Sequence, residues 1–277
     1  MDFLFLDSKK CPNKSRRFLH ALYRSAKKAG ASCAIEPKYT ECNALVVYGL
    51  GGADRYSVGM EHMASGKPLL SFDLGYWGRK LPHRKYRFSL NGLHPWQVME
   101  TKYPGPGRWN KSGLTIKTLP TNDSGPILLV GNAPKSIAVG AKNWTAEKSR
   151  EIRRAFPGRK ILYRPKPKRP HESGVVYDGV SDAPIDAALK QSALVVCRHS
   201  NVAVDACRLG IPVVCEDGAA ASIYPRRLAD WEEQPDLKTR TEFLHRLAYW
   251  QWGLNEVELF WGWFFNTFPA YDYRRFY

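Results

Sequence analysis

Three polar residues in the C-terminal half have the types and the spacing to bind a phosphate group. His199, Ser200 and Asn201 come just after the apolar run at residues 193–197, Ala-Leu-Val-Val-Cys, which is typical of a buried strand. Gly210 marks the end of the short helix that we expect next. A turn that opens a helix presents free backbone N–H groups and the positive end of the helix dipole. The pattern therefore predicts that a diphosphate binds at this turn.

Asp205 lies about one helical turn beyond Ser200 in the same segment. A carboxylate at that position accepts hydrogen bonds from the hydroxyl groups of a ribose, so we expect the ligand to be a nucleotide. The alternative is an ordinary β-α-β unit, in which Ser200 caps the helix and Asp205 is a solvated surface residue. Short motifs of this kind also occur by chance, so this segment alone leaves both interpretations open.

Two further polar loops are expected beside this turn. Each follows a short apolar run, at residues 127–130 and 161–163, that reads as a strand. If the strands are parallel, their carboxyl ends meet at one edge of the sheet, where basic side chains would stabilise a departing diphosphate. The alternative is a solvated Lys/Pro loop. The residues expected to bind the nucleotide from these two loops are Gly131, Asn132, Lys135, Arg164 and Lys166.

Two residues of the N-terminal half are candidates for a general base. Asp73 comes at the end of the apolar run at residues 69–72, and a carboxylate at the end of a parallel strand points to the ligand edge of the sheet. His94 is the rival candidate. The alternative is that Asp73 caps a turn and that His94 is a loop histidine with its hydrogen bonds satisfied.

Basic residues alternate with aromatic residues at three places in the N-terminal half. Lys and Arg contact phosphates, and aromatic side chains stack on bases that have left the helical stack, so this pattern favours DNA binding. The alternative is a basic surface that covers ordinary core aromatics. The candidate DNA-binding residues are Tyr76, Trp77, Arg79, Lys80, Arg84, Lys85, Arg87 and Arg108.

The basic charge is concentrated in the same half of the chain. The formal net charge is +16. Residues 1–118 contain 20 Lys and Arg against 8 Asp and Glu, whereas residues 119–277 contain 22 against 18. A basic field of this kind favours a polyanionic partner, which is a nucleic acid, an anionic membrane surface or an acidic glycan.

Composition narrows the class of protein. Hydrophobic residues make up 44% of the 277 residues and charged residues 25%, as in soluble globular proteins. No apolar run is long enough to span a membrane, and residues 1–7 read as a first strand, so we expect neither membrane insertion nor a leader peptide. The six cysteines are scattered without a Cys-x-x-Cys pair. We therefore expect reduced thiols, a cytoplasmic location and no structural metal site.

Strand-like and helix-like segments alternate in both halves of the chain, which predicts an α/β fold with mostly parallel sheets. A stretch rich in Pro, Gly, Asn, Ser and Thr at residues 102–126 interrupts the alternation and reads as a linker. We divide the chain into an acceptor domain at residues 1–118, a nucleotide domain at 119–245, and an aromatic-rich helical tail at 246–277.

The segment from Ser200 to Val213 has the pattern Ser-x-x-x-x-Asp-Ala-x-x-x-Gly-x-Pro-Val, which resembles the donor-nucleotide segment of GT-B glycosyltransferases. The turn at residues 164–167, Arg-Pro-Lys-Pro, is similar to the Arg-Pro-His-Pro loops of capsule-type and sialyl-type transferases, with Lys166 where those families have His. The resemblance implies two Rossmann-like domains facing a central cleft, with C-terminal helices that cross back onto the first domain. In motif it covers residues 127–216.

Within this superfamily, the small size and the basic acceptor half resemble bacteriophage DNA glucosyltransferases. The resemblance implies transfer of a sugar from a nucleotide-sugar donor of the UDP-glucose type to hydroxymethylated pyrimidines in double-stranded DNA, by a monomer in the host cytoplasm. It leaves open whether a divalent metal is used. One alternative is a capsule- or lipopolysaccharide-type glycosyltransferase that works at an anionic membrane or glycan. The other is a DNA-binding protein that has kept the fold without catalysis.

Overall fold

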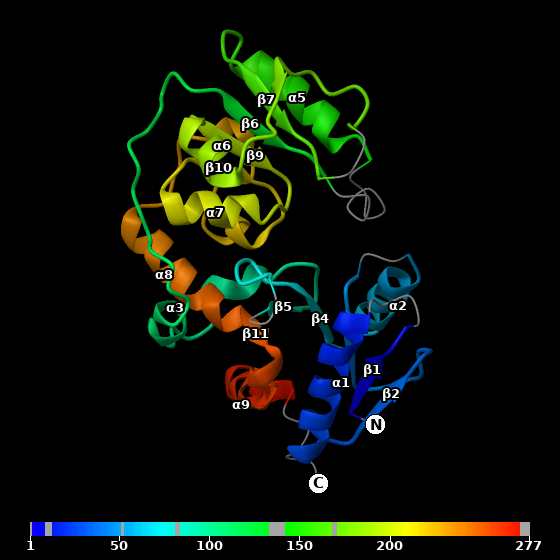
Figure 1. Cartoon of the computed structure of the whole chain (residues 1–277). Coiled ribbons are helices and arrows are strands. Elements are labelled where there is room, and N and C mark those ends of the chain that lie inside the picture. Colours follow the sequence, from blue (N-terminus) through cyan, green and yellow to red (C-terminus); the bar gives the residue numbers. More distant parts are fainter. Residues whose placement is uncertain are drawn as a thin grey trace. The chain divides into compact units, whose positions relative to one another are not determined.

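The computed structural model describes residues 2–8, 13–50, 53–80, 84–132, 142–167 and 171–271. The chain forms two compact units (Figure 1). The first unit combines Met1–Pro95 with Tyr249–Tyr277, and the second is Trp96–Ala248. The C-terminal segment therefore belongs to the same unit as the N-terminus.

The first unit contains a six-stranded sheet in its described part, with the strand order β11-β5-β4-β3-β1-β2. Strands β1 to β4 are parallel, while β5 runs antiparallel to both β4 and β11. The parallel strands are mostly continuous apolar runs, as expected where helices cover both faces of a sheet. The strands are β1 (Phe3–Leu6), β2 (Cys33–Glu36), β3 (Ala44–Tyr48), β4 (Leu69–Leu74), β5 (Lys85–Leu90) and β11 (Gln251–Gly253).

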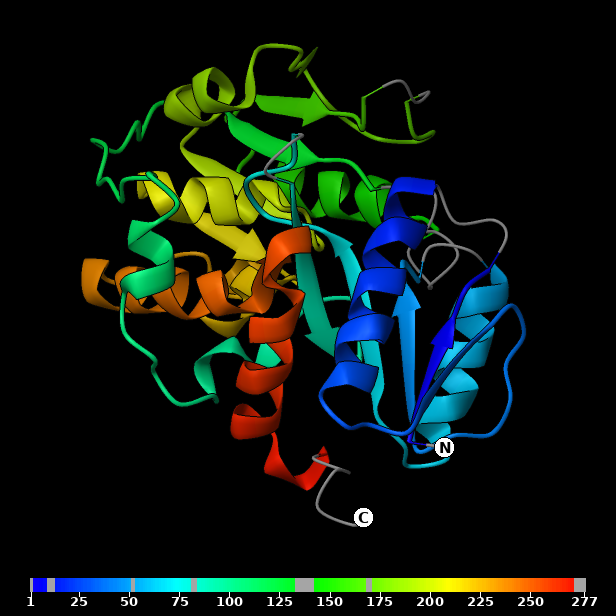
Figure 2. The same cartoon turned by 60° about the horizontal axis from the view of Figure 1, so that its bottom comes forward.

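Three helices cover this sheet: α1 (Asn13–Lys28), α2 (Ala53–Ala64) and α9 (Val257–Thr267). Helices α1 and α9 lie side by side on one face, in front of the strands in Figure 2. Trp261 of α9 contacts both α1 and the sheet. Its Nε1 donates to the Leu22 carbonyl of α1 at 3.1 Å, and its ring packs against Phe3 of β1. Helix α2 packs on β3 and β4, where Leu45 and Leu69 are fully buried.

The second unit contains a five-stranded parallel sheet in the order β10-β9-β6-β7-β8. The first strand along the chain, β6, is central. The chain then adds β7 and β8 on one side of it and β9 and β10 on the other, so the strand order reverses between β6 and β9. The strands are β6 (Ile127–Val130), β7 (Ile161–Arg164), β8 (Gly179–Val180), β9 (Leu194–Cys197) and β10 (Val213–Cys215).

The second unit also contains five described α-helices, and short 3-10 helices occur in both units. The α-helices are α3 (Gly107–Asn110), α5 (Trp144–Ala155), α6 (Ile185–Gln191), α7 (Val202–Leu209) and α8 (Leu237–Leu247). The 3-10 helices are η1 (Trp96–Met99), η2 (Ala219–Ser222), η3 (Leu228–Asp230), η4 (Ala248–Trp250), η5 (Leu254–Glu256) and η6 (Pro269–Tyr271). In the described part of the chain, no helix has the length and the apolar character needed to cross a bilayer.

A buried arginine fixes the end of α7. Gly210 ends the helix in the left-handed region, with φ of 79°, a conformation that glycine adopts without strain. Arg240 lies beside it and is 5% exposed. Its guanidinium donates to the carbonyls of Cys207 and Lys117 at 2.8 and 3.1 Å, and to the Thr118 hydroxyl at 2.8 Å. This side chain therefore satisfies carbonyls at the helix end and holds the segment before β6 in place.

The structure confirms the predicted α/β class with two sheets rich in parallel strands. Two details differ from the sequence-based expectation. The N-terminal segment of the first unit ends at Pro95 and not at residue 118, because η1 and α3 pack against α8 in the second unit. Strand β5 is antiparallel, since it follows β4 across a short connection.

Candidate functional site

The candidate site of the second unit lies at the carboxyl edge of its sheet, where the strand order reverses between β6 and β9. In parallel α/β sheets, ligands bind outside the carboxyl ends of the strands at this point of reversal. Gly131 and Asn132 follow β6, and His199 and Ser200 follow β9. The topology therefore brings two of the three predicted loops to the position that is typical of a ligand site.

A hydrogen bond brings in the third loop. Lys166, which follows β7, directs its Nζ to the Ser200 Oγ at 3.3 Å. The same hydroxyl accepts a bond from the backbone N–H of Val202, the first residue of α7, also at 3.3 Å. Asn201 stands at the N-cap position, and its side chain makes no capping bond. A lysine ammonium and the N-terminus of a helix are thus close together, and both favour an anion.

A carboxylate that the sequence analysis missed shapes the loop after β6. The Glu172 Oε1 accepts the backbone N–H of Asn132 at 2.7 Å and the Tyr163 hydroxyl at 3.2 Å. A Cβ on Gly131 would lie 2.8 Å from that hydroxyl and 2.9 Å from Glu172, so no larger residue fits without a shift. The Asn132 amide in turn donates to Thr145 of α5 at 3.2 Å. The glycine is therefore required here by the contact between the loop and Glu172.

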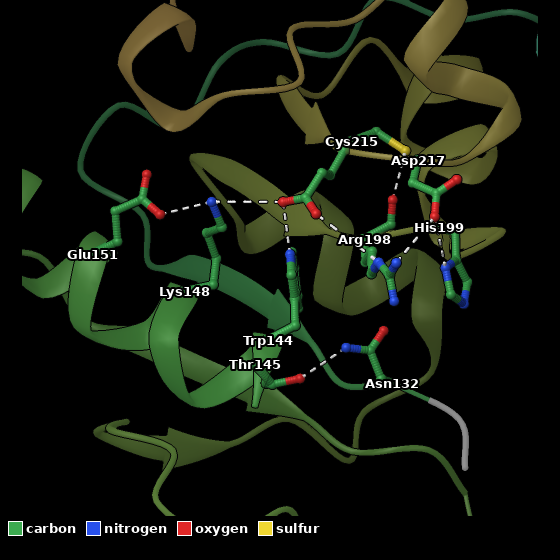
Figure 3. Close-up of polar contacts among 10 residues, drawn as sticks. Asn132, Trp144, Thr145, Lys148, Glu151, Arg198, His199, Cys215 and Asp217 are labelled. Atoms are coloured by element: carbon green, nitrogen blue, oxygen red, sulfur yellow. Dashed lines mark hydrogen bonds and ion pairs between the residues drawn. The ribbon is translucent and has the colours of Figure 1, made fainter. Parts of the chain in front are cut away.

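Two carboxylates after β10 hold Arg198 beside these loops (Figure 3). The Arg198 Nη2 lies 3.5 Å from Asp217, and its Nε lies 3.9 Å from Glu216. Trp144 of α5 donates from its indole Nε1 to Glu216 at 2.7 Å, and Lys148 lies 3.8 Å from the same carboxylate. None of these residues was among the predicted site residues. The sequence signal that could have found them is the pair Glu216 and Asp217, which directly follows the apolar strand β10.

His199 is held neutral at physiological pH. Burial lowers the pKa of its imidazole, and the Asp217 carboxylate, 3.8 Å away, opposes that shift only in part. A neutral imidazole offers one hydrogen-bond donor and one acceptor. His199 can therefore orient a polar ligand group without adding a second positive charge to that of Arg198.

The remaining predicted nucleotide-binding residues have mixed placements. The Arg164 Nη1 donates to the Ala183 carbonyl at 2.7 Å and to Ser181 at 3.3 Å, in the loop after β8. This contact braces the loop, and binding of a diphosphate by Arg164 stays a prediction. Asp205 lies half-buried on α7, as the helix prediction required. Lys135 lies outside the described residues.

The predicted general bases of the first unit lie within packed structure. Asp73 is part of β4 and does not follow it. Its Oδ2 forms an ion pair with the Arg87 Nη2 at 3.2 Å, across the antiparallel pairing of β4 and β5. His94 is 6% exposed. The catalytic roles of Asp73 and His94 remain predictions.

Two of the predicted DNA-binding residues are buried. Tyr76 is 3% exposed and Arg87 6%, and the Arg87 guanidinium lies over the Tyr76 ring, 5.6 Å from its centroid. The expectation that Tyr76 and Arg87 contact DNA at the surface is corrected, because both side chains are buried. Arg87 instead forms an ion pair with Asp73. Trp109, the aromatic residue next to the predicted DNA-binding residue Arg108, is also buried.

The other candidates are half-buried or exposed, and several brace the polypeptide. Arg79 donates to the carbonyls of Gly75 and Tyr76, and Arg84 donates to the Arg79 carbonyl. Lys85 forms an ion pair with Glu256 at 2.6 Å, and Arg108 donates to the Ala248 carbonyl. Trp77 is half-buried, whereas Lys80 is exposed. Among the basic candidates, Arg79 and Lys80 are exposed, whereas Arg84, Lys85 and Arg108 are half-buried.

Among the described residues, no group of three or more His, Cys, Asp or Glu side chains is placed to hold a metal ion. In the described part of this edge, Lys166 and the N-terminus of α7 favour negative charge, whereas Arg198 is paired with Asp217 and Glu216. These groups suit an anionic ligand.

No protein-family model matches the chain. No curated protein matches it in sequence either. Two solved structures of KpsC from Thermosulfurimonas dismutans are similar in fold. The beta Kdo 2,4 transferase is 14% identical, with 91% of each chain covered and a TM-score of 0.50. The beta Kdo 2,7 transferase is 13% identical over 94% of this chain and 98% of its own, with a TM-score of 0.53.

At this level of identity the likeness defines the fold alone. Both units are Rossmann-like α/β units, and the two similar structures cover 91% and 94% of this chain. The fold is therefore of the GT-B type, as the pattern between Ser200 and Val213 indicated.

Proposed function

We propose that the chain is a glycosyltransferase that takes a sugar from a nucleotide-activated donor. One observation carries the proposal: Lys166, His199 and Ser200 converge with the N-terminus of α7 at the edge where the strand order of the second unit reverses. An ammonium group and the positive end of a helix dipole at that point are suited to the phosphate of a nucleotide, which must leave as an anion.

The fold likeness supports the same activity. Both similar structures are named as Kdo transferases, enzymes that transfer a sugar, and both match more than nine-tenths of this chain. We expect a donor of the uridine diphosphate type, with Asp205 on the ribose and Asn132 near the base or the sugar. Fold alone does not define a substrate, so the donor has to be identified by direct assay.

An anionic glycan is the acceptor that we favour. The chain carries a net charge of +16, which favours a polyanion. Base stacking by aromatic side chains would be needed for access to a flipped pyrimidine, yet Tyr76 and Trp109 from the basic and aromatic clusters are buried. A basic surface fits the carboxylates or phosphates of an acidic saccharide.

Double-stranded DNA with hydroxymethylated pyrimidines is the second candidate acceptor. Exposed Arg79 and Lys80, together with half-exposed Trp77, form a surface that would contact a phosphate backbone. Transfer of glucose to such DNA would make the chain a DNA-modifying enzyme. Binding of DNA without any transfer would instead make it a non-catalytic DNA-binding protein.

The test is a transfer assay with a panel of nucleotide sugars against three acceptors: hydroxymethylated duplex DNA, plain duplex DNA, and acidic oligosaccharides. Products are read by mass spectrometry of the digested nucleosides and of the saccharides. We expect a mass increase of one sugar on the saccharide with one class of donor. Sugar on the hydroxymethylated nucleoside would establish the second candidate, and no transfer to any acceptor would contradict the proposal.

A further inference from the structure

The outer face of helix α1 carries positive charge from its second turn to its end. The helix contains six Lys and Arg residues and no Asp or Glu. Arg24 and Lys28 follow Arg17 by seven and eleven residues, which is about two and three helical turns, so the three residues share one face. All three are exposed, as is Lys27 in the last turn. We call these four residues the cationic stripe.

The opposite face of α1 is the one that packs on the first unit's sheet. Phe18, Leu19 and Leu22 are fully buried, and α1 lies in front of the strands in Figure 2. Burial of such an apolar face supplies most of the stability of a helix in a protein. The cationic stripe therefore belongs to the surface and is not needed for the core.

Two other basic residues of α1 have a partner inside the first unit. The Arg16 guanidinium donates to both carboxylate oxygens of Asp7, at 2.7 and 2.6 Å. The His20 Nε2 lies 2.9 Å from the second of these oxygens. Asp7 directly follows β1, so these contacts attach α1 to the sheet. Basic side chains that have a structural role in this helix thus come with a carboxylate.

The cationic stripe lacks such carboxylates for three of its four residues. In the described part of the chain, no Asp or Glu lies within ion-pairing distance of Arg17, Arg24 or Lys27. Lys28 pairs with Glu258 of α9 at 2.9 Å, and the two side chains are 73% and 65% exposed. An exposed pair of this kind contributes little, so an incoming anion can replace Glu258.

The stability of the helix does not account for this charge pattern. Lys27 and Lys28 lie in the last turn, where the helix dipole favours cations. Arg17 lies toward the other end, where the dipole offers a cation no stabilisation. Arg24 precedes Lys27 and Lys28 by three and four residues, and like charges at these spacings repel each other. The stripe therefore weakens the helix, which indicates a binding role.

The stripe is long and narrow, which limits the kind of anion that it fits. Helix α9 lies beside α1 on the same face of the sheet and contains no Lys or Arg. The positive charge is thus confined to one helix and extends about 16 Å from Arg17 to Lys28, at 1.5 Å per residue. A membrane presents a plane of negative charge, whereas a linear polymer presents a line that matches the stripe.

The exposed side chains of α1 also distinguish between linear polymers. None of its described exposed residues is aromatic, so the stripe has no surface on which the bases of a single-stranded nucleic acid could stack. The stripe offers charge alone, at intervals along one line. This arrangement suits a chain of sugars that carry carboxylates or phosphates.

We propose that the cationic stripe binds an acidic saccharide chain and holds the acceptor at sugar residues beyond the one that is modified. The role of the bound chain rests on the proposed glycosyltransferase function. Successive anionic groups of the saccharide pair with Arg17, Arg24 and Lys28, and Lys28 exchanges Glu258 for the ligand. A longer chain meets more of these cations at once, so affinity rises with chain length.

The test measures binding in the absence of any donor. The probes are a fluorescently labelled dimer and decamer of galacturonic acid, titrated with full-length protein and followed by anisotropy. Arg17→Gln combined with Arg24→Gln, the stripe variant, should raise the Kd for the decamer about 2- to 30-fold, as expected for the loss of two exposed charge pairs. The Kd for the dimer should rise less. The slope of log K against log salt should fall by about 1 for each lost contact.

Arg154→Gln combined with Lys190→Gln is the matched control. These residues are exposed on α5 and α6 of the second unit, and the two double variants have the same net charge. The control should bind the decamer as the wild type does. An equal loss of affinity in both variants would mean that net charge alone drives binding, and a lower melting temperature of the stripe variant would mean that Arg17 and Arg24 are structural. Either result overturns the inference.

The outcomes separate this inference from the proposed function. With a donor that supports transfer, the KM for the decamer should rise in the stripe variant by a factor similar to that of the Kd. If transfer occurs and the stripe variant binds the decamer as tightly as the wild type, the inference is wrong while the glycosyltransferase function stands. If the decamer binds through the stripe and no acceptor receives sugar, the saccharide site stands while the proposed function and the acceptor role are wrong.

Two other polyanions are compared with the saccharide. Vesicles of phosphatidylcholine and phosphatidylglycerol report membrane binding by co-sedimentation, and a labelled DNA duplex reports binding to nucleic acid. We expect the stripe variant to lose more affinity for the decamer than for the vesicles or the duplex. A loss confined to the vesicles or to the duplex would assign the stripe to that partner and overturn the inference of a saccharide site.

Discussion

The Lys166 ammonium and the Ser200 hydroxyl form a hydrogen bond of 3.3 Å that joins the loop after β7 to the loop after β9. Ser200 also accepts the first N–H of α7, so one hydroxyl links a cation to a helix N-terminus. A serine that merely caps a helix would need the backbone contact alone. The lysine adds a positive charge at the point where the helix dipole already favours an anion.

From this contact we expect Lys166→Ala to weaken nucleotide binding. A hydrogen bond that involves a charged group contributes about 1.5–3 kcal/mol, which corresponds to a Kd increase of about 10- to 100-fold. Titration calorimetry with the nucleotide that supports transfer measures the change. Lys190→Ala removes an exposed lysine of α6 and should leave the Kd as it is. Equal affinities for all three proteins would remove Lys166 from the donor site.

Gly131→Ala should loosen the loop after β6. The added Cβ would lie 2.8 Å from the Tyr163 hydroxyl and 2.9 Å from the Glu172 carboxylate, so one of these groups must move and Asn132 loses part of its support. We expect a loss of about 1–3 kcal/mol in the free energy of unfolding and weaker nucleotide binding. Gly158→Ala, where a Cβ meets no atom within 4 Å, is the control in urea unfolding and calorimetry. A fully stable Gly131→Ala protein with normal affinity would contradict this account of the loop.

Asp73→Asn should destabilise the first unit whether or not it affects catalysis. The substitution leaves Arg87, which is 7% exposed, without its carboxylate, and an unsatisfied buried group costs about 1–3 kcal/mol or more when charged. Asp73→Asn combined with Arg87→Met removes both charges and should recover part of the stability in urea unfolding. Equal losses in the single and double variants would show that the ion pair is not the cause. Reduced activity of Asp73→Asn is therefore interpretable only beside its unfolding curve.

Local patterns were enough to predict much of the second unit. The apolar runs, the polar turn at His199 and Ser200, and Gly210 indicated β9, α7 and β10, and the structure places all three. The hydrogen bonds of Arg164 could not be predicted, because its partners, Ser181 and Ala183, follow β8. That strand is two residues long and leaves almost no periodic signal.

The sheet edge of the first unit could not be predicted in the same way. Arg87 looked like a surface residue because its counter-charge, Asp73, lies 14 residues away and faces it only in the antiparallel register of β4 and β5. Asp7 was recognised only as the end of a strand. Its meeting with His20 depends on how α1 packs over β1, a tertiary contact that residue spacing does not report. Asp7 after an apolar run, with Arg16 and His20 on one side of the next helix, was the available signal.

His199 should make stability depend on pH below neutrality. Burial lowers the pKa of its imidazole in the folded state, so the unfolded chain takes up a proton at a higher pH than the folded chain does. The stabilising effect is complete above the unfolded value of about 6.5 and is lost as the pH falls through the lower, folded pKa. Urea unfolding at pH 7.5 and 5.0 should show a smaller loss for His199→Gln than for the wild type. An equal loss would mean that His199 is as easily protonated in the folded protein as in the unfolded chain.

Binding to an acidic acceptor should depend steeply on salt, because neutralisation of its charges releases counterions. Lys80 is exposed and Arg84 half-exposed, so reversal of their charges to Glu should weaken binding to every acidic polymer alike. Each lost contact should also reduce the slope of log K against log salt by about 1. Lys190→Glu makes the same change in net charge on α6 of the second unit, and it should alter the slope less. Fluorescence anisotropy with labelled acidic oligosaccharide and with duplex DNA, from about 50 to 200 mM salt, gives the slopes. If Lys190→Glu weakens binding as much as Lys80→Glu does, net charge alone drives the association and this surface of the first unit does not bind the acceptor.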